Sequence, residues 1–148
     1  METDRFGSNS LRAVASMLLI LDTSFLIRIS TRPLHSESLS TSFGGYDRVT
    51  VVEVISELER IAKRTDTTRG KDARLALAYA KDLRIVGDDE NRNKRGFPPA
   101  DERILQYAKG KKDVAIASLD RSLLQEARKN GIRIISLSRE RVVGSPVL

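Results

Sequence analysis

Short apolar runs alternate with longer stretches of helical periodicity along most of this 148-residue chain. Strands that alternate with helices predict a parallel sheet covered by helices on both faces. We therefore expect one α/β domain, a three-layer α/β/α arrangement around a central parallel sheet of about five strands. The expected strands are residues 17–21, 48–51, 84–86, 114–118 and 132–137; the expected helices are residues 24–30, 52–64, 70–83, 100–109 and 121–130, with a poor helix within 31–47.

The N-terminal segment differs from the rest of the chain. Residues 1–16 are largely polar and show no strand or helix period until the apolar run begins. Met17 stands at the start of the first expected strand and could itself be the start of translation. We interpret residues 1–16 as a disordered or misassigned extension and residues 17–148 as the folded domain.

Composition narrows the chemistry that is available. The chain has no cysteine and a single histidine, His35, which excludes disulfides, thiolate zinc sites and two-histidine zinc motifs. The longest apolar run is too short to cross a bilayer and has no signal-peptide cleavage pattern, so we expect no membrane partner and a cytoplasmic location. Catalysis would have to use carboxylates, hydroxyls, lysines and arginines.

The net charge of +6 makes a polyanion such as nucleic acid the first partner to consider. Aromatic residues make up only 5% of the chain and tryptophan is absent, which favours contacts to phosphates over base stacking. Two basic clusters stand out. Arg92, Lys94 and Arg95 lie in a long polar loop that could close over a phosphate backbone, whereas the cluster at 109–112 precedes a strand and belongs to the opposite edge of the sheet.

Two aspartates directly follow expected strands. Asp22 follows the first strand and Asp120 follows the fourth, and ligands of open α/β sheets bind at this edge. Helices begin just after both, so each aspartate could equally be a helix N-cap. On the helix at 100–109, Asp101 lies three and four residues before the apolar Ile104 and Leu105, which places it on the inward stripe. A bound cation would compensate such a carboxylate.

The helix at 52–64 carries three glutamates whose roles periodicity does not decide. Glu57 and Glu59 border the apolar stripe on opposite sides, and we place Glu53 on the far side. Either border glutamate could reach a site at the sheet edge, and either could equally be a solvated residue that supports the helix.

Four segments together resemble the PIN domain family. They are a strand with its acid and two hydroxyls at 19–24, a glutamate–leucine pair at 57–58, the acidic helix start at 100–105, and Ser118-Leu119-Asp120 opening a helix. The four occur in the family's order and span roughly residues 17–138. The chain is most similar to archaeal stand-alone PIN proteins and pre-ribosomal-RNA-processing endonucleases, with VapC-type toxins more distant.

This resemblance implies a metal-dependent endoribonuclease that uses Mg²⁺ or Mn²⁺. Asp22, Asp101 and Asp120 would bind the metal directly, Glu57 would bind it through water or orient the attacking water, and Ser118 would donate to a carboxylate or phosphate. The products would carry 5′-phosphate and 3′-hydroxyl ends. The implied partners are RNA, a second copy of the chain, and an antitoxin or a ribosome-assembly protein.

Two other functions remain as hypotheses. One is an inactive PIN-like module that binds RNA or protein in a larger assembly, and Leu119 is compatible with it because many family members have a polar residue there. The other is a phosphorelay receiver, which would need paired acids after the first strand and a lysine after the fifth. Asp22 stands alone, and the fifth strand ends without lysine, which argues against a receiver.

Overall fold

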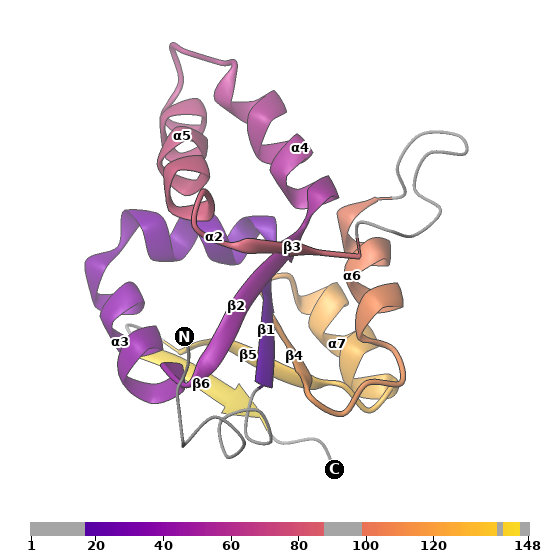
Figure 1. The fold of residues 1–148 in the computed structure, drawn as a ribbon. Coiled ribbons are helices and arrows are strands. Elements are labelled where there is room, and N and C mark those ends of the chain that lie inside the picture. Colours follow the sequence, from indigo (N-terminus) through magenta and orange to yellow (C-terminus); the bar gives the residue numbers. More distant parts are fainter. Residues whose placement is uncertain (1–16, 88–98, 139–140, 146–148) are drawn as a thin grey trace, which may run out of the picture.

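A computed structural model describes residues 17–87, 99–138 and 141–145, which form a six-stranded sheet with helices on both sides (Figure 1). The strand order is β3-β2-β1-β4-β5-β6. The strands are β1 (Met17–Leu21), β2 (Tyr46–Val51), β3 (Arg84–Val86), β4 (Val114–Ala117), β5 (Arg133–Ser138) and β6 (Arg141–Ser145). The helices are α2 (Thr23–Thr31), α3 (Pro33–Phe43), α4 (Val52–Ala62), α5 (Thr68–Ala80), α6 (Ala100–Ala108) and α7 (Arg121–Lys129).

The first five strands are parallel, so the predicted three-layer α/β/α fold is confirmed. The sixth strand was not predicted. It pairs antiparallel with β5 and closes that edge of the sheet. Its sequence contains only two consecutive large apolar residues, Val142 and Val143, which is too short a run to indicate a strand by itself.

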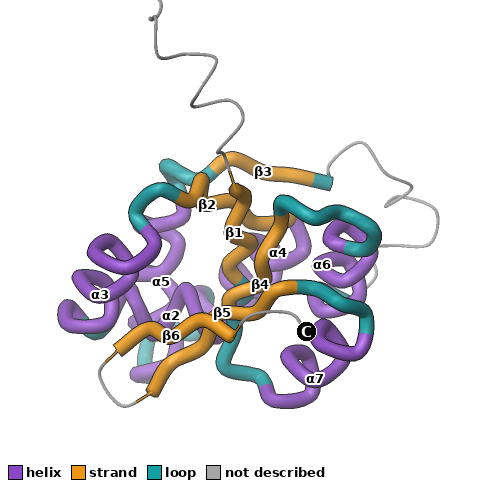
Figure 2. Tube along the Cα trace, turned by 90° about the horizontal axis from the view of Figure 1, so that it is seen from below, coloured by secondary structure: helices purple, strands orange, loops and turns teal. Residues whose placement is uncertain are grey.

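The helices form two layers that differ in size (Figures 1 and 2). Helices α2, α3 and α5 lie on one side of the sheet, and α6 and α7 lie on the other. Helix α4 begins directly where β2 ends and contacts both α5 and α6. Helix α4 therefore lies at the carboxyl end of β2 and contacts helices of both layers.

Strands β1 and β4 lie at the centre of the sheet, which explains why their sequences are unbroken apolar runs. Residues 19–21 of β1 are fully buried, and no residue of β4 exposes more than 1% of its surface. Strands covered on both faces lose the apolar–polar alternation of half-exposed strands. Ala115 and Ala117 also leave room for close packing of helices against the centre of the sheet.

Most of the expected boundaries lie within a few residues of the observed ones. The weakly patterned stretch at 31–47 contains α3, which begins at Pro33, a residue whose fixed φ suits the first helical turn. The single histidine, His35, is buried in this helix. The extension at 1–16 and the loop cluster of Arg92, Lys94 and Arg95 lie outside the described residues. None of the helices within the described ranges is long and apolar enough to span a membrane.

The chain reverses its direction of travel across the sheet between β1 and β4. From β1 it adds β2 and β3 on one side, then crosses to β4 and β5 on the other. Leu21 at the end of β1 pairs with Ala117 at the end of β4, so the residues that follow these two strands emerge side by side. Such a switch point is where open α/β sheets bind ligands.

Candidate active site

Asp22 is the most deeply placed acid at the switch point. It exposes only 4% of its surface. Its Oδ1 accepts hydrogen bonds from the backbone N–H of Phe25 (2.8 Å) and the hydroxyl of Ser24 (2.9 Å), and its Oδ2 accepts one from the hydroxyl of Ser118. Asp22 is therefore the N-cap of α2, as one of the two interpretations of the sequence required. The same carboxylate also contacts Ser118 in the β4–α7 connection, so capping α2 is compatible with a role at the site.

Two serines join the end of β1 to the end of β4. Ser118 donates to Asp22 and accepts from the backbone N–H of Asp120 (2.9 Å). Ser24 donates to Asp22 and accepts from the backbone N–H of Leu119 (3.1 Å). Ser24 was not predicted as a site residue. Its position two residues after Asp22 is the sequence feature that could have indicated this role. Leu119 takes part through its backbone, which any residue except proline provides.

Asp120 and Asp101 face each other from two helix N-termini. Asp120 caps α7 by accepting from the backbone N–H groups of Ser122 (2.9 Å) and Leu123 (3.4 Å). Asp101 lies in the first turn of α6. Partial burial raises the pKa of Asp101, and the charge of Asp120, a hydrogen bond with that side chain and the charge of Glu57 raise it further. Three of the predicted acids are thus close enough to repel one another.

Glu57 reaches the same region from the middle of α4. Its Oε1 accepts a hydrogen bond of 2.7 Å from the hydroxyl of Thr23, the first residue of α2. Of the two glutamates that border the apolar stripe, Glu57 is the one that contacts α2 at this region, whereas Glu59 is exposed. Thr23 was also missed as a site residue. Its position immediately after the strand-end acid would have been the clue, because consecutive hydroxyls at a helix start are free to bond outside the helix.

The electrostatics of the site are unfavourable without a cation. The pKa of Asp22 is raised from 3.8 to about 6 overall, because burial and the charge of Asp101 raise it by more than the hydrogen bonds from Ser118, Phe25 and Ser24 lower it. Among the described residues, none of Asp22, Glu57, Asp101 and Asp120 forms an ion pair with lysine or arginine. The N-termini of α2, α6 and α7 place the positive ends of three helix dipoles at Asp22, Asp101 and Asp120.

The donor set fits a hard divalent cation that keeps part of its water shell. No three carboxylate or histidine side chains in the described part of the chain are placed to hold one ion together as they stand. Mg²⁺ usually takes only one or two protein carboxylates directly and binds the rest through water. Such a site needs carboxylate oxygens that are not already paired with a basic side chain. Among the residues that the structure describes, Asp22, Asp101, Asp120 and Glu57 meet this condition, and a cation would relieve their mutual repulsion.

The placement of Glu53 on the far side of α4 was wrong. Glu53 is buried, and its Oε2 accepts from Nε of Arg103 at 3.3 Å. The side chains of Glu53 and Arg103 are only 3% and 4% exposed. Residues four apart lie on the same side of a helix, so Glu53 belongs with Glu57. The two helices joined by this buried pair, α4 and α6, are those that carry Glu57 and Asp101.

The expected inward stripe of α6 was also partly wrong. Arg103, Ile104 and Ala108 are buried, whereas Leu105 is half-buried and Asp101 is exposed. The helix is turned so that a charged residue, Arg103, occupies a core position that apolar periodicity alone would not assign. The carboxyl of Asp101 nevertheless interacts with Asp120 and Glu57 because it lies at the end of α6 that points to the site.

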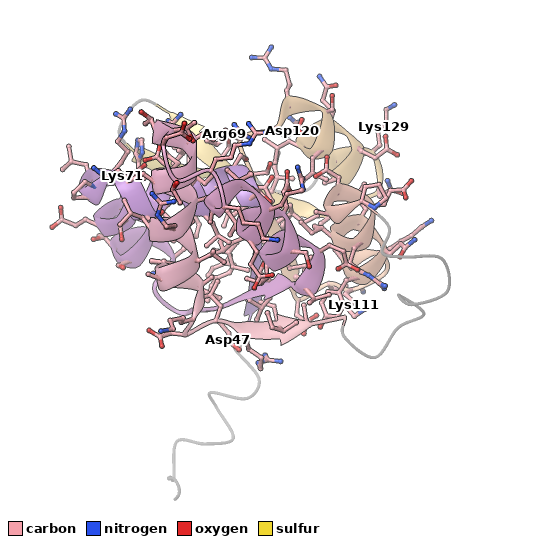
Figure 3. The ribbon with its side chains drawn as sticks, turned by 90° about the horizontal axis from the view of Figure 1, so that it is seen from above. Asp47, Arg69, Lys71, Lys111, Asp120 and Lys129 are labelled. Atoms are coloured by element: carbon pink, nitrogen blue, oxygen red, sulfur yellow. The ribbon has the colours of Figure 1, made fainter. Side chains whose placement is uncertain are left out.

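The basic cluster at 109–112 lies away from the acids, as its position before β4 predicted. Figure 3 shows Lys111 and Asp47 on the opposite side of the molecule from Asp120. Lys111 donates to the backbone carbonyl of Tyr107 (2.6 Å) and lies 4.3 Å from the centre of the Tyr107 ring. The role of Lys111 is therefore explained by local contacts on α6.

The chain is similar to known nucleases both in sequence and in structure. The chain is 29% identical over 131 residues to ribonuclease VapC4 of Methanocaldococcus jannaschii, covering 83% of this chain and 92% of that protein. It also superposes on the structure of the PIN domain endonuclease Utp24 with a TM-score of 0.65 and 27% identity, covering 88% of this chain and 92% of that one. The chain has the PIN-domain fold. No protein-family model matches it.

The PIN domain is thus similar to a VapC ribonuclease and to the endonuclease Utp24 at nearly the same identity. Both comparisons cover more than four fifths of the chain. In this PIN domain the site is formed by β1–α2, α4, the start of α6 and β4–α7.

Proposed function

We propose that this PIN domain is a divalent-metal-dependent endoribonuclease. One observation carries the proposal: carboxylates from four separate elements converge at the switch point of the sheet, and no basic side chain of the described residues pairs with them. A purely structural role would explain Asp22 and Asp120 as helix caps but would leave the approach of Asp101 and Glu57 unexplained. The similarity to two nucleases supports the same conclusion.

The chain's own residues have distinct tasks in the proposed reaction. Asp22, Asp101 and Asp120 would hold Mg²⁺ or Mn²⁺, which when bound supplies neutralising charge and a more acidic water. Ser118 and Ser24 fix the carboxylate of Asp22 by hydrogen bonding.

Glu57 would orient the attacking water in this reaction. Its Oε1 is held by Thr23, which leaves the second oxygen of the carboxylate to accept a hydrogen bond from that water. Direct attack by water on the phosphorus, with cleavage of its bond to the 3′ oxygen, forms no covalent intermediate and leaves 5′-phosphate and 3′-hydroxyl ends.

The proposed substrate is RNA, single-stranded or structured, and the proposed location is the cytoplasm. The proposed protein partners are a second copy of the chain and an antitoxin or ribosome-assembly protein. Leu34 of α3 and Leu75 of α5 are exposed apolar residues that a second copy could cover. Sedimentation at several protein concentrations tests for the homodimer directly.

The activity is tested with end-labelled single-stranded RNA incubated with purified protein in Mg²⁺, Mn²⁺ or EDTA. We expect cleavage with either metal, none in EDTA, and a loss of at least about 100-fold in Asp101→Asn, because removing a metal ligand removes transition-state stabilisation. Asp47→Asn is the matched control, since Asp47 lies on the opposite side of the molecule and pairs with the exposed Arg84.

The alternative function is a binding module without catalysis. That function would be favoured if no RNA is cut in any metal and if Mn²⁺ leaves the melting temperature unchanged. Cleavage that persists in Asp101→Asn would instead indicate a contaminating nuclease. Ligation-based mapping of the ends distinguishes 5′-phosphate products from the 5′-hydroxyl products of metal-independent ribonucleases.

A further inference from the structure

A cavity of about 550 Å³ opens beside the acidic site, between α4 and α6. On the α4 side it is lined by Glu53, Ser56, Glu57 and Arg60, and on the α6 side by the first residues of that helix, including Asp101. Its volume lies within the range of about 300–1,000 Å³ that small-molecule sites occupy. Because Glu57 and Asp101 belong to both, the cavity is a continuation of the acidic site.

Arg60 is the basic residue of this cavity. It lies three residues after Glu57 on α4, so both side chains project from the same side of the helix. Three carboxylates line the same cavity, yet Arg60 forms no ion pair or hydrogen bond with any described residue. An exposed and unpaired guanidinium next to a phosphodiester-cutting site is suited to hold a phosphate through two parallel hydrogen bonds.

Glu53 lines the same cavity and has one carboxylate oxygen without a partner among the described residues. Its Oε2 is paired with Arg103, but its Oε1 is buried and has no hydrogen-bond partner among the described residues. A buried acceptor left unsatisfied is costly, so a ligand that donates to it gains affinity. Glutamate accepts from the N4 amino group of cytosine, whereas uracil presents a carbonyl oxygen at the same position.

We propose that this cavity binds one nucleotide of the RNA next to the scissile phosphate. Arg60 binds the phosphate of that nucleotide, and Glu53 accepts a hydrogen bond from an amino group of its base, so that cytosine is preferred over uracil. The inference rests on the proposed ribonuclease function and extends it by naming the residues that select the substrate.

The phosphate contact is tested by RNA affinity, separately from cleavage. Binding of a fluorescein-labelled 12-nucleotide RNA of random sequence is measured in Mg²⁺ at several salt concentrations, in an Asp120→Asn background that leaves the RNA intact. Asp120 does not line the cavity. Adding Arg60→Ala should weaken binding about 5- to 20-fold and lower the salt slope by about 0.7–1, because one phosphate contact is lost.

Lys111→Ala is the control for net charge in the same background. It removes one positive charge from an exposed lysine on the opposite side of the molecule from Asp120, so it should change affinity less than twofold and leave the salt slope unchanged. Equal effects of the two substitutions would overturn the proposal. Restoration of most of the affinity by Arg60→Lys would support a charge contact, with the remaining deficit caused by loss of the paired hydrogen bonds.

The base contact is tested in the same Asp120→Asn background, which keeps the RNA intact and leaves the buried pair of Glu53 and Arg103 unchanged. Oligo(C) and oligo(U) of 12 nucleotides are compared for binding in the same salt. We expect oligo(C) to bind at least about fivefold more tightly, as one discriminating base contact provides. Equal binding of the two would overturn the proposal.

The outcomes also separate this inference from the proposed function. Binding that depends on Arg60 and favours oligo(C), without cleavage in any metal, would support the nucleotide site and overturn the nuclease. Metal-dependent cleavage with binding that is insensitive to Arg60→Ala would support the nuclease and overturn the nucleotide site.

Discussion

The buried carboxyl of Asp22 makes the metal-free PIN domain sensitive to pH. Its pKa is raised from 3.8 to about 6, so between these values the folded protein binds more protons than the unfolded chain. Stability from this group is therefore fully present below pH 4 and is lost as pH rises through 6. Asp101, whose pKa is also raised, acts in the same direction.

We expect the metal-free protein to be more stable at pH 5 than at pH 7.5, with Asp22 contributing about 1.4 kcal/mol to the difference. Urea unfolding in EDTA at the two pH values measures it. Asp22→Asn keeps a side chain that can cap α2 but cannot titrate, so it should remove most of the difference. A pH dependence that is the same in native protein and Asp22→Asn would show that Asp22 is not the titrating group.

Ser118 should control the pH at which activity is lost. Its hydroxyl donates to Asp22 and is the largest contribution that lowers the pKa of that carboxyl. Ser118→Ala should therefore raise the pKa of Asp22 and move the acidic limb of the rate–pH profile upward by about 0.4–1 pH units, as expected for one hydrogen bond. Cleavage rates from pH 5 to 8.5 at fixed Mn²⁺ measure the limb.

Ser122→Ala is the control for this prediction. Ser122 is exposed at the start of α7, and only its backbone N–H contacts Asp120. Its substitution should leave the limb in place. A rate in Ser118→Ala that falls equally at every pH would mean that the hydroxyl acts on the substrate instead of on the acidity of Asp22.

At the residue scale, local patterns made Asp22, Asp101 and Asp120 candidates, and only the family resemblance chose Glu57 and expected Ser118 to donate to a carboxylate. Strand ends and helix starts identified Asp22 and Asp120 because both positions follow directly from local patterns. Thr23 and Ser24 were missed because a hydroxyl near a helix start has many local partners, and only the fold brings Glu57 and the β4–α7 connection within reach. Such long-range hydrogen bonds have no sequence period.

At the scale of elements, the buried pair of Glu53 and Arg103 joins α4 to α6. Breaking a buried ion pair leaves one charge without compensation, whereas replacing both partners by apolar residues removes the desolvation penalty as well. We expect Arg103→Met to lower the free energy of unfolding by about 3–5 kcal/mol, and the double substitution Glu53→Leu with Arg103→Met to recover most of that loss. Urea unfolding of the single and double variants measures both.

If the double variant were as unstable as Arg103→Met alone, the expected recovery would be contradicted. The loss would then come from the volume and stem contacts of the arginine and not from the stranded charge of Glu53. Arg74→Met on α5 is a control, since Arg74 is exposed and donates only to the carbonyl of Ala62. It should change the free energy of unfolding by less than about 1 kcal/mol.

The same pair shows why the elements were easier to predict than their faces. Apolar spacing gave the existence and approximate bounds of α4 and α6, because strong periodicity needs no tertiary information. It gave the wrong side for Glu53 and a partly wrong buried face for α6, because a charged residue enters the core only when a partner from another element neutralises it. The antiparallel β6 was missed for a related reason, as its pairing with β5 supplies what its short apolar run does not.

At the scale of the whole molecule, the topology assembles a site from segments that are far apart in the chain. Asp22 and Asp120 are brought together by the pairing of β1 with β4, and Glu57 and Asp101 by the contact of α4 with α6. A parallel sheet sends all its strand ends to one edge, so the fold class alone predicted the edge. The fold also places four carboxylates where folding must overcome their repulsion.

Metal should stabilise the whole fold, and Asp120→Asn should separate the capping role of Asp120 from its role at the metal site. At 100 times the dissociation constant a ligand adds about 2.7 kcal/mol to the free energy of unfolding, so saturating Mn²⁺ should raise the melting temperature by about 5–15 °C.

Asparagine caps a helix as well as aspartate does, so Asp120→Asn should melt in EDTA at or above the native temperature, because α7 keeps its cap and the charge that repels Asp101 is gone. The same variant should lose most of the increment with Mn²⁺, whereas Asp47→Asn should keep it. If Asp120→Asn instead melted well below the native protein in EDTA and kept the full increment, Asp120 would serve α7 alone and the metal would depend on the other three acids.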